Sequence, residues 1–127
     1  MATVYVKRLA GWARSKFGAK GERIDGQWFA SKREAKRWAD LQLLVRAGAI
    51  TGLVRQHRFD LNTLNPDDRL VTIGVYVADF VYRERDLRAG GVTGPPIVED
   101  SKGFKTELYL WKRKHFELQY GFAIRET

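Results

Sequence analysis

The amino-acid sequence predicts an α+β domain whose elements follow the order helix, three antiparallel strands, helix and strand. Two segments show helical periodicity with start and stop signals, and they cover about residues 31–48 and 106–121. Between them, runs rich in β-branched and aromatic residues at 53–61, 70–82 and 97–104 are separated by turn-forming residues. These observations together predict a mixed sheet flanked by helices.

Length, charge and cysteine content narrow the class of protein. The 127 residues are enough for one ordinary core, and no run of about 18 apolar residues suggests a membrane span. The N-terminus lacks the pattern of a secretory signal, so we expect a cytoplasmic protein without membrane partners. The absence of cysteine excludes disulfides, thiolate zinc sites and a cysteine nucleophile. Any metal must therefore be bound through oxygen or histidine.

The formal net charge of +8 and the pI near 10.0 favour a polyanionic partner, and nucleic acid is the obvious candidate. A basic protein without a particular partner remains the alternative. Residues 1–23 form a predicted basic arm, followed by one domain at residues 24–127. The basic residues of the arm that are candidates for phosphate contacts are Lys7, Arg8, Arg14, Lys16 and Lys20. A solvated, frayed terminus is the alternative.

The first predicted elements are a hairpin and a helix. The pair Asp25-Gly26 is typical of a tight β-turn, and Ser31 to Glu34 has the form of a capping box. Gly48 ends the helix. Its predicted inner face contains Ala35, Trp38, Leu41, Leu44 and Val45. Glu34 extends this stripe and could reach inward, although capping by itself also explains a glutamate there.

Two of the predicted strands carry charges within apolar rows. In residues 70–82, Asp79 interrupts the row formed by Val71, Ile73, Val75, Val77 and Val81. In residues 97–104, Asp100 and Lys102 share a face with Val98 and Phe104, and Glu99 points the other way unless a bulge shifts the strand. The glycine- and proline-rich loop at 84–96 returns the chain, so the two strands become neighbours.

The second helix begins at Thr106 and ends at Gly121. We expect its inner face to contain Leu108, Trp111, His115 and Leu118. Lys105, Lys112 and Lys114 lie on other faces, where they either contact phosphates or are simply solvated. Neither histidine has a metal-ligand spacing, and we favour a structural role for both. His115 is interpreted as a core residue, and His57, on a strand, could alternatively face a substrate beside Gln56 or Arg55. Residues 122–125 form a short last strand.

The acidic residues and Lys102 suit phosphodiester hydrolysis. Carboxylates bind Mg²⁺, a bound water then loses its proton more readily, and a lysine can position this water or share the charge of the phosphate. Glu34, Asp79 and Asp100 are the candidate acids, with Glu99 in place of Asp100 if a bulge occurs. A buried Asp–Lys pair with a purely structural role is the alternative.

These residues resemble the motif of the PD-(D/E)XK nucleases, through Asp79 in VADF, Asp100-Ser101-Lys102 in VEDSKG, and Glu34 on the preceding helix. The resemblance covers about residues 25–125 and is nearest to small phage endonucleases of the Holliday-junction-resolvase type and to transposon endonuclease subunits. Ala78 stands where the motif has proline. The resemblance implies a restriction-endonuclease-like core and an endodeoxyribonuclease.

In that family the acids matching Asp79 and Asp100 bind metal, the lysine matching Lys102 assists the attacking water, and the glutamate matching Glu34 completes the site. The cofactor implied is Mg²⁺, for which Mn²⁺ can substitute. The partners implied are DNA, possibly branched, and a second copy of the chain in a homodimer. If the protein is phage-encoded, it would act in the host cytoplasm. A non-catalytic nucleic-acid-binding module and a restriction- or transposon-type nuclease are the alternatives.

Overall fold

The computed structural model describes residues 21–24 and 26–127 of the chain. The basic arm residues Lys7, Arg8, Arg14, Lys16 and Lys20 therefore lie outside the described residues. The chain forms two compact units, and the boundary between them falls between Asp40 and Leu41. Among the described residues, no helix is long and apolar enough to cross a membrane.

The first unit contains the predicted hairpin and the start of the predicted helix. Strands β1 (Glu22–Ile24) and β2 (Gln27–Phe29) pair antiparallel, and Gly26 in the turn has a φ of 78°. Helix α2 spans Lys32–Arg46. The Ser31 hydroxyl accepts a hydrogen bond of 3.2 Å from the backbone N–H of Glu34. This bond is the N-terminal cap that the sequence predicted.

The buried stripe of α2 is shorter than predicted. Ala35 and Leu41 are fully buried, and Trp38 is half-buried with its ring centroid 6.2 Å from that of Phe29. Leu44 and Val45, however, are exposed. The prediction was wrong for the last turn, because helical spacing identifies a common face but not how much of its length is covered. Gly48, with a φ of 75°, follows the helix as expected.

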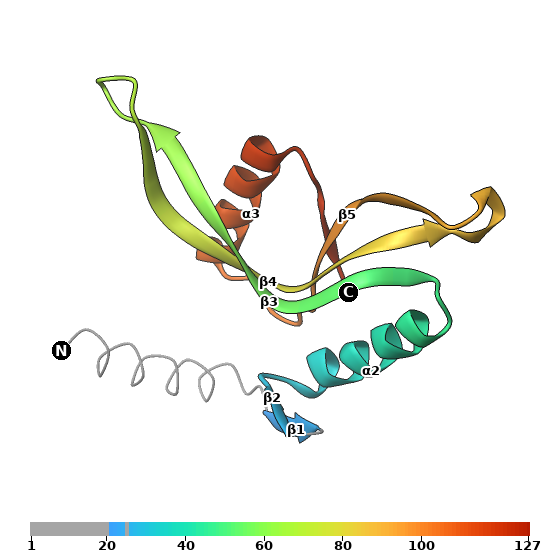
Figure 1. The fold of residues 1–127 in the computed structure, drawn as a ribbon. Coiled ribbons are helices and arrows are strands. Elements are labelled where there is room, and N and C mark those ends of the chain that lie inside the picture. The colour runs from blue at the N-terminus through green and yellow to red at the C-terminus, as the bar shows by residue number, and fades with distance from the viewer. Residues whose placement is uncertain (1–20, 25) are drawn as a thin grey trace. The chain divides into compact units, whose positions relative to one another are not determined.

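The second unit is built on a four-stranded sheet (Figure 1). Its strands, in spatial order, are β3 (Ile50–Leu64), β4 (Leu70–Asp86), β5 (Val92–Asp100) and β6 (Ile124–Glu126). The first three are antiparallel, and β6 runs parallel to β5. A 3₁₀ turn, η1 (Leu87–Ala89), joins β4 to β5, and helix α3 (Glu107–Tyr120) joins β5 to β6. The predicted α+β class and element order are confirmed.

The strand boundaries differ from the predictions at functionally relevant places. β4 continues to Asp86, and β5 already begins at Val92, so most of the predicted loop at 84–96 is a hairpin. The strand predicted to reach Phe104 ends at Asp100. Beyond that point the backbone N–H of Ser101 donates to Asp79 and that of Lys102 to the carbonyl of Thr127. Phe104 is consequently exposed and does not anchor the strand.

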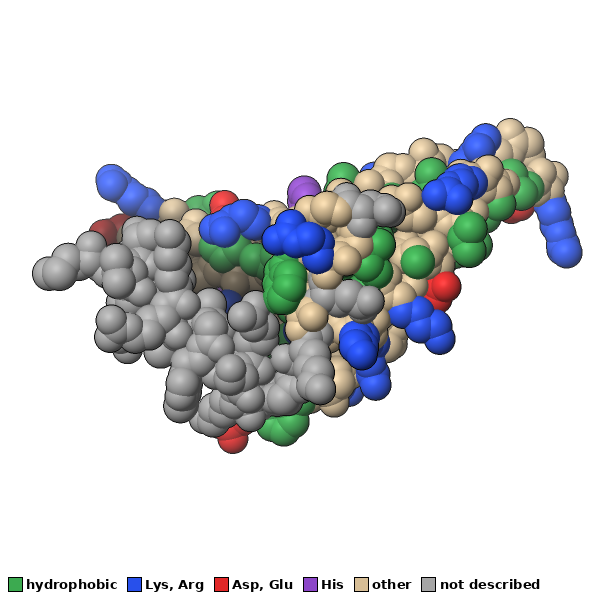
Figure 2. Space-filling view, turned by 90° about the horizontal axis from the view of Figure 1, so that it is seen from below, with side chains coloured by type: hydrophobic (Ala, Val, Ile, Leu, Met, Phe, Trp, Pro, Cys, Tyr) green, Lys and Arg blue, Asp and Glu red, His purple; other side chains and the backbone are tan. Residues whose placement is uncertain are grey.

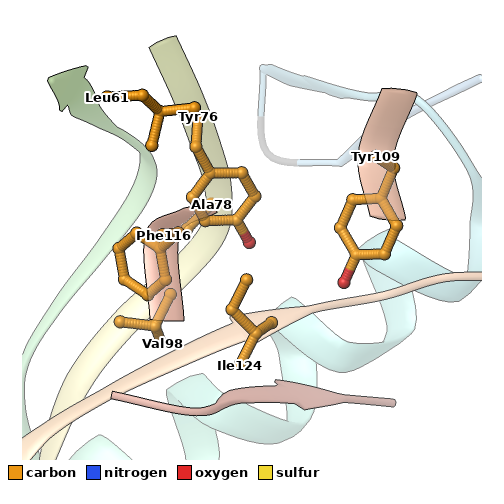
Figure 3. Packing of buried hydrophobic residues seen from close by; sticks show 7 residues of the cluster. All are labelled: Leu61, Tyr76, Ala78, Val98, Tyr109, Phe116 and Ile124. Atoms are coloured by element: carbon orange, nitrogen blue, oxygen red, sulfur yellow. The ribbon is translucent and has the colours of Figure 1, made fainter. Parts of the chain in front are cut away.

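Aromatic residues of β4 and α3 make the core between the sheet and α3 (Figure 3). Tyr76 and Ala78 belong to this buried cluster, and Val81 packs against it. The predicted row of Val71, Ile73, Val75 and Val77 is therefore not the buried row. The buried side chains of β4 alternate instead at Tyr76, Ala78, Phe80 and Tyr82. The cluster consists of Leu61, Tyr76, Ala78, Val98, Tyr109, Phe116 and Ile124.

Helix α3 also faces the sheet differently from the prediction. Tyr109 and Phe116 are buried, while Leu108, Trp111 and Leu118 are exposed, Leu118 at 81%. Both stripes have helical spacing, so periodicity could not choose between them. The aromatic stripe also has hydrogen-bond partners at the sheet: Tyr120 donates to the Asp60 carbonyl at 2.7 Å, and Tyr109 donates to Glu126 at 3.0 Å. Thr106 and Gly121 cap the helix as predicted.

The two stripes of α3 can be distinguished by mutation. Phe116→Ala removes a fully buried ring and should destabilise the protein by about 3–5 kcal/mol. Leu118→Ala should change the free energy of unfolding by about 0.5 kcal/mol or less, because this side chain is exposed. Urea unfolding followed by circular dichroism measures both values. Equal losses would contradict the orientation of α3 described above.

Candidate functional site

The ladder between β4 and β5 places the two aspartates of the predicted site side by side. Phe80 pairs with Glu99 and Val81 with Val98, so the next positions along the two strands are Asp79 and Asp100. Directly opposed residues of antiparallel strands share a face. The carboxylates are thus brought together by strand register, as the sequence predicted.

Asp100 is completely buried, and two polar side chains contact its carboxylate. The Tyr76 hydroxyl donates a hydrogen bond to its Oδ2 atom. The Lys102 ammonium lies 3.7 Å from its Oδ1 atom, in an ion pair whose lysine side chain is 26% exposed. Apart from this ion pair, Oδ1 is a buried oxygen without a hydrogen-bond partner. The predicted pairing of Asp100 with Lys102 is present, even though Lys102 lies beyond the end of the strand.

Asp79 is held by groups from two neighbouring segments. Its Oδ2 atom accepts from the backbone N–H of Ser101 at 2.9 Å, and its Oδ1 atom accepts from the side-chain amide of Gln56 at 3.3 Å. Gln56 lies opposite Asp79 in the ladder, between the pairs formed by Arg55 and His57, and has a φ of 51°. Such a left-handed conformation is uncommon for residues other than glycine.

The surroundings of Asp100 change its acidity. The pKa of Asp100 is raised to about 7, first by burial and then by the charge of Asp79 and a side-chain hydrogen bond with it. The Lys102 ammonium and the Tyr76 hydroxyl oppose this effect. Burial and the neighbouring Asp100 raise the pKa of Tyr76, so this phenol remains a donor. A raised carboxyl pKa next to a second carboxylate is frequent at functional sites, although structural networks also produce it.

Two tyrosines at the site were not identified from the sequence. Tyr76 contacts Asp100, and the ring of Tyr109 lies 4.4 Å from the Lys102 ammonium. Burial and Asp100 raise the pKa of Tyr109 as well. Both tyrosines have the apolar spacing of a core face, and nothing in their local sequence distinguishes them from ordinary core residues.

Glu99 points away from the pair, as expected from strand alternation. It is fully buried and accepts a hydrogen bond of 2.5 Å from the Tyr82 hydroxyl. The irregularity between β4 and β5 lies between Arg83 and Arg85, away from Glu99 and Asp100. The bulge that would have exchanged Glu99 for Asp100 is therefore not present.

Glu34 lies in the first turn of α2 and is only 4% exposed. Its backbone N–H takes part in the cap at Ser31. Glu34 belongs to the first compact unit, whereas the aspartates belong to the second, so its participation in the site stays a prediction. Among residues 21–24 and 26–127, no three acidic or histidine side chains are grouped to hold a metal ion.

The donors present are compatible with a hard divalent cation bound by two carboxylates. Mg²⁺ is usually held through one or two carboxylates and keeps several waters. Asp79 and Asp100 are adjacent, and Oδ1 of Asp100 is a buried acceptor that a cation would satisfy. These two residues would hold the metal, while Lys102 would remain beside it.

The two histidines do not contribute to the carboxylate pair. A ring nitrogen of His115 lies 2.8 Å from the Asn62 carbonyl, and the ring is half-buried. His115 is thus a satisfied structural residue, as the sequence suggested. His57 is exposed and packs edge-on against Phe59, with ring centroids 4.7 Å apart.

A pocket of about 240 Å³ lies beside the ion pair. Lys102 lines it, together with residues from β4 and the first turns of α3. The predicted phosphate-binding lysines of this region differ in their surroundings: Lys105 pairs with Glu126 at 3.3 Å, Lys112 lines the pocket, and Lys114 is exposed. In Figure 2, the blue basic side chains of the described residues lie at several separate places on the face that is shown.

The raised pKa of Asp100 predicts a pH-dependent gain in stability for Asp100→Asn. Below pH 4 the wild-type carboxyl is protonated in both the folded and the unfolded state, so its titration has no effect on stability. Between pH 4 and about 7 the Asp100 carboxyl ionises in the unfolded chain but stays largely protonated in the folded protein. The free energy of unfolding of the wild type therefore falls as the pH rises through this range. Above pH 7 the variant should therefore be more stable by up to about 4 kcal/mol, since one pH unit corresponds to about 1.4 kcal/mol.

Denaturant unfolding of both proteins from pH 4.5 to 8.5 measures this difference. The difference between variant and wild type cancels the contributions of other titrating groups, such as Glu126. Burial would raise the pKa of Glu126, but hydrogen bonds from Tyr109 and Lys105 lower it. A difference in stability that does not change with pH would contradict the assignment.

Comparison with known proteins identifies the family but not the activity. Searches among curated proteins and among solved structures found no match. A family described as a protein of unknown function, DUF1064, matches residues 14–125, a range that includes Asp79, Asp100 and Lys102. Because this match covers most of the 127 residues, the chain belongs to the DUF1064 family.

Proposed function

We propose that the protein is a metal-dependent endonuclease that hydrolyses phosphodiester bonds in DNA. The observation that carries this proposal is the side-by-side placement of Asp79 and Asp100, with the Lys102 ammonium 3.7 Å from Asp100. Two adjacent carboxylates, with a lysine that lines a pocket, can serve metal-assisted phosphodiester hydrolysis. The basic composition of the chain agrees with a nucleic-acid substrate.

The arrangement of elements supports a PD-(D/E)XK-type core. The resemblance implies the order helix, three antiparallel strands, helix and strand. The chain follows this order with α2, β3 to β5, α3 and the parallel strand β6. Asp79 comes from the central part of β4, and Asp100 from the end of the neighbouring strand β5. This correspondence in topology is an argument from analogy, so the chemistry of the residues has to carry the functional proposal.

Each residue of the proposed site has a separate task. Asp79 and Asp100 hold Mg²⁺ or Mn²⁺, which when bound makes a coordinated water more acidic. The Ser101 N–H and the Gln56 amide fix the Asp79 carboxylate, and the Tyr76 hydroxyl fixes Asp100. Lys102 lies beside the proposed metal ligands, where its ammonium shares the negative charge that develops on the phosphate. Glu34 is a proposed third acid.

Branched DNA is the proposed substrate, because the motifs resemble those of small phage junction resolvases. In this proposal two copies of the chain act as a homodimer to cut two symmetric strands. A restriction- or transposon-type nuclease would use the same residues on a different DNA structure. The choice among these substrates depends on the resemblance and not on the geometry of the site.

A non-catalytic nucleic-acid-binding module is the second candidate, and one observation favours it. Asp100 is completely buried, and within the described part of the chain only two acids meet at the site. In such a module, Asp79, Asp100 and Lys102 would form a structural network and the basic residues would bind phosphates. Binding without products would then be the whole activity.

Cleavage assays on four-way junction, flap and linear DNA, with and without Mg²⁺, separate these candidates. The wild-type protein should nick DNA only with the metal. Asp79→Ala and Lys102→Met should each lower the rate at least about 100-fold, because they remove a metal ligand and the adjacent cation. Asp67→Ala is the control, since it removes an exposed carboxylate from the turn between β3 and β4.

Cleavage that persists at the wild-type rate in Asp79→Ala would refute the proposed site. DNA binding without any cleavage under all metal conditions would favour the binding module. Products from the junction but not from linear DNA would support the branched substrate.

A further inference from the structure

The pocket beside the ion pair contains a second lysine with unusual surroundings. It is lined by Lys102 and Lys112 and by the apolar side chains of Val75, Val77 and Leu108. All of these residues belong to the second compact unit, on β4, on the segment after β5 and on the first turns of α3. The pocket therefore has two cations at its wall and apolar surface around them.

Among the described residues, Lys112 lacks an acidic partner, unlike Lys102, Lys105 and Arg113. Lys102 pairs with Asp100, while Lys105 and Arg113 pair with Glu126 at 3.3 and 2.8 Å. Lys112 is half-buried and forms no ion pair with any residue in the described ranges. A partly desolvated ammonium without a counter-ion is unfavourable. An anion from outside the protein would remove this cost.

We propose that this pocket binds one phosphate group of a nucleic-acid strand, with Lys112 as its counter-ion. This inference rests on the nucleic-acid function proposed above and assigns a position to the substrate backbone. Because Lys102 belongs both to the pocket and to the ion pair with Asp100, the bound phosphate is the scissile group or its immediate neighbour. Lys112 is then a positioning residue for the strand, and Val75, Val77 and Leu108 contact the attached sugar.

The size of the pocket limits what it can hold. Its volume of about 240 Å³ lies below the roughly 300–1,000 Å³ of sites for drug-sized ligands. It has room for a phosphate with part of its sugar, whereas a base pair would have to remain outside. Phosphate contacts of this kind fix the register of a strand without reading its sequence. The site should thus act on many sequences alike.

The test compares Lys112→Met with Lys114→Met in binding assays without divalent metal. Methionine keeps much of the apolar stem of lysine and removes only the charge. Lys114 is the matched control, because it lies on the same helix but is exposed and does not line the pocket. Binding of a labelled four-way junction is measured by fluorescence anisotropy in EDTA at several salt concentrations, after circular dichroism has shown that both variants are folded.

Lys112→Met should weaken binding about tenfold, and the slope of log K against log salt should fall by about one. Lys114→Met should have a clearly smaller effect. A series of junctions, each with one phosphate replaced by an uncharged methylphosphonate, locates the contact. At one position the replacement should weaken binding by the wild type but not by Lys112→Met.

Equal effects of the two substitutions, with no such position in the series, would overturn the pocket assignment even if the wild type cleaves DNA. Loss of affinity specific to Lys112→Met would support it even if no cleavage is found and the nuclease proposal fails. Thymidine monophosphate and inorganic phosphate serve as competitors. If either displaces the junction at a concentration close to the dissociation constant of the DNA, the pocket serves a free small anion and the proposal is wrong.

Discussion

The buried carboxylate of Asp100 is the constraint on which the second compact unit depends. A charged group without water requires partners, and here they come from two segments: Tyr76 on β4 and Lys102 after β5. The neighbouring carboxylate of Asp79 opposes them, because its charge raises the pKa of Asp100. Replacing this network by apolar residues would in many proteins be neutral or stabilising. Its presence at the end of a strand, beside a pocket, is easier to explain by chemistry than by stability.

Strand β4 contributes residues both to the core and to the carboxylate pair. Tyr76 and Ala78 belong to the core between the sheet and α3, and Val81 packs against it. Asp79 accepts a hydrogen bond from Gln56 on β3, which has an uncommon left-handed conformation. Such departures from regular backbone geometry are common at functional sites.

Helix α3 connects the core with the candidate binding surface. Its aromatic stripe packs on the sheet, and Tyr109 extends from the cluster to the Lys102 ammonium. The adjacent turn of α3 carries Lys112 to the pocket. Lys102 contacts the ring of Tyr109, and Lys112 lies on the same helix as Tyr109. Helix α3 thus fixes the position of Lys112 relative to Lys102. The exposed apolar stripe with Leu118 is left facing away from the sheet.

The sequence by itself determined the element order, the helix caps at Ser31 and Thr106, and the choice of Asp100 over Glu99, because these depend on local spacing. It could not determine which apolar stripe of β4 or α3 is buried, since both stripes have the same period and only packing against a partner decides between them. The sequence also did not reveal the contacts that Tyr76, Gln56 and Tyr109 make at the site. Their roles arise from contacts between residues distant in the chain, and those contacts exist only in the tertiary structure.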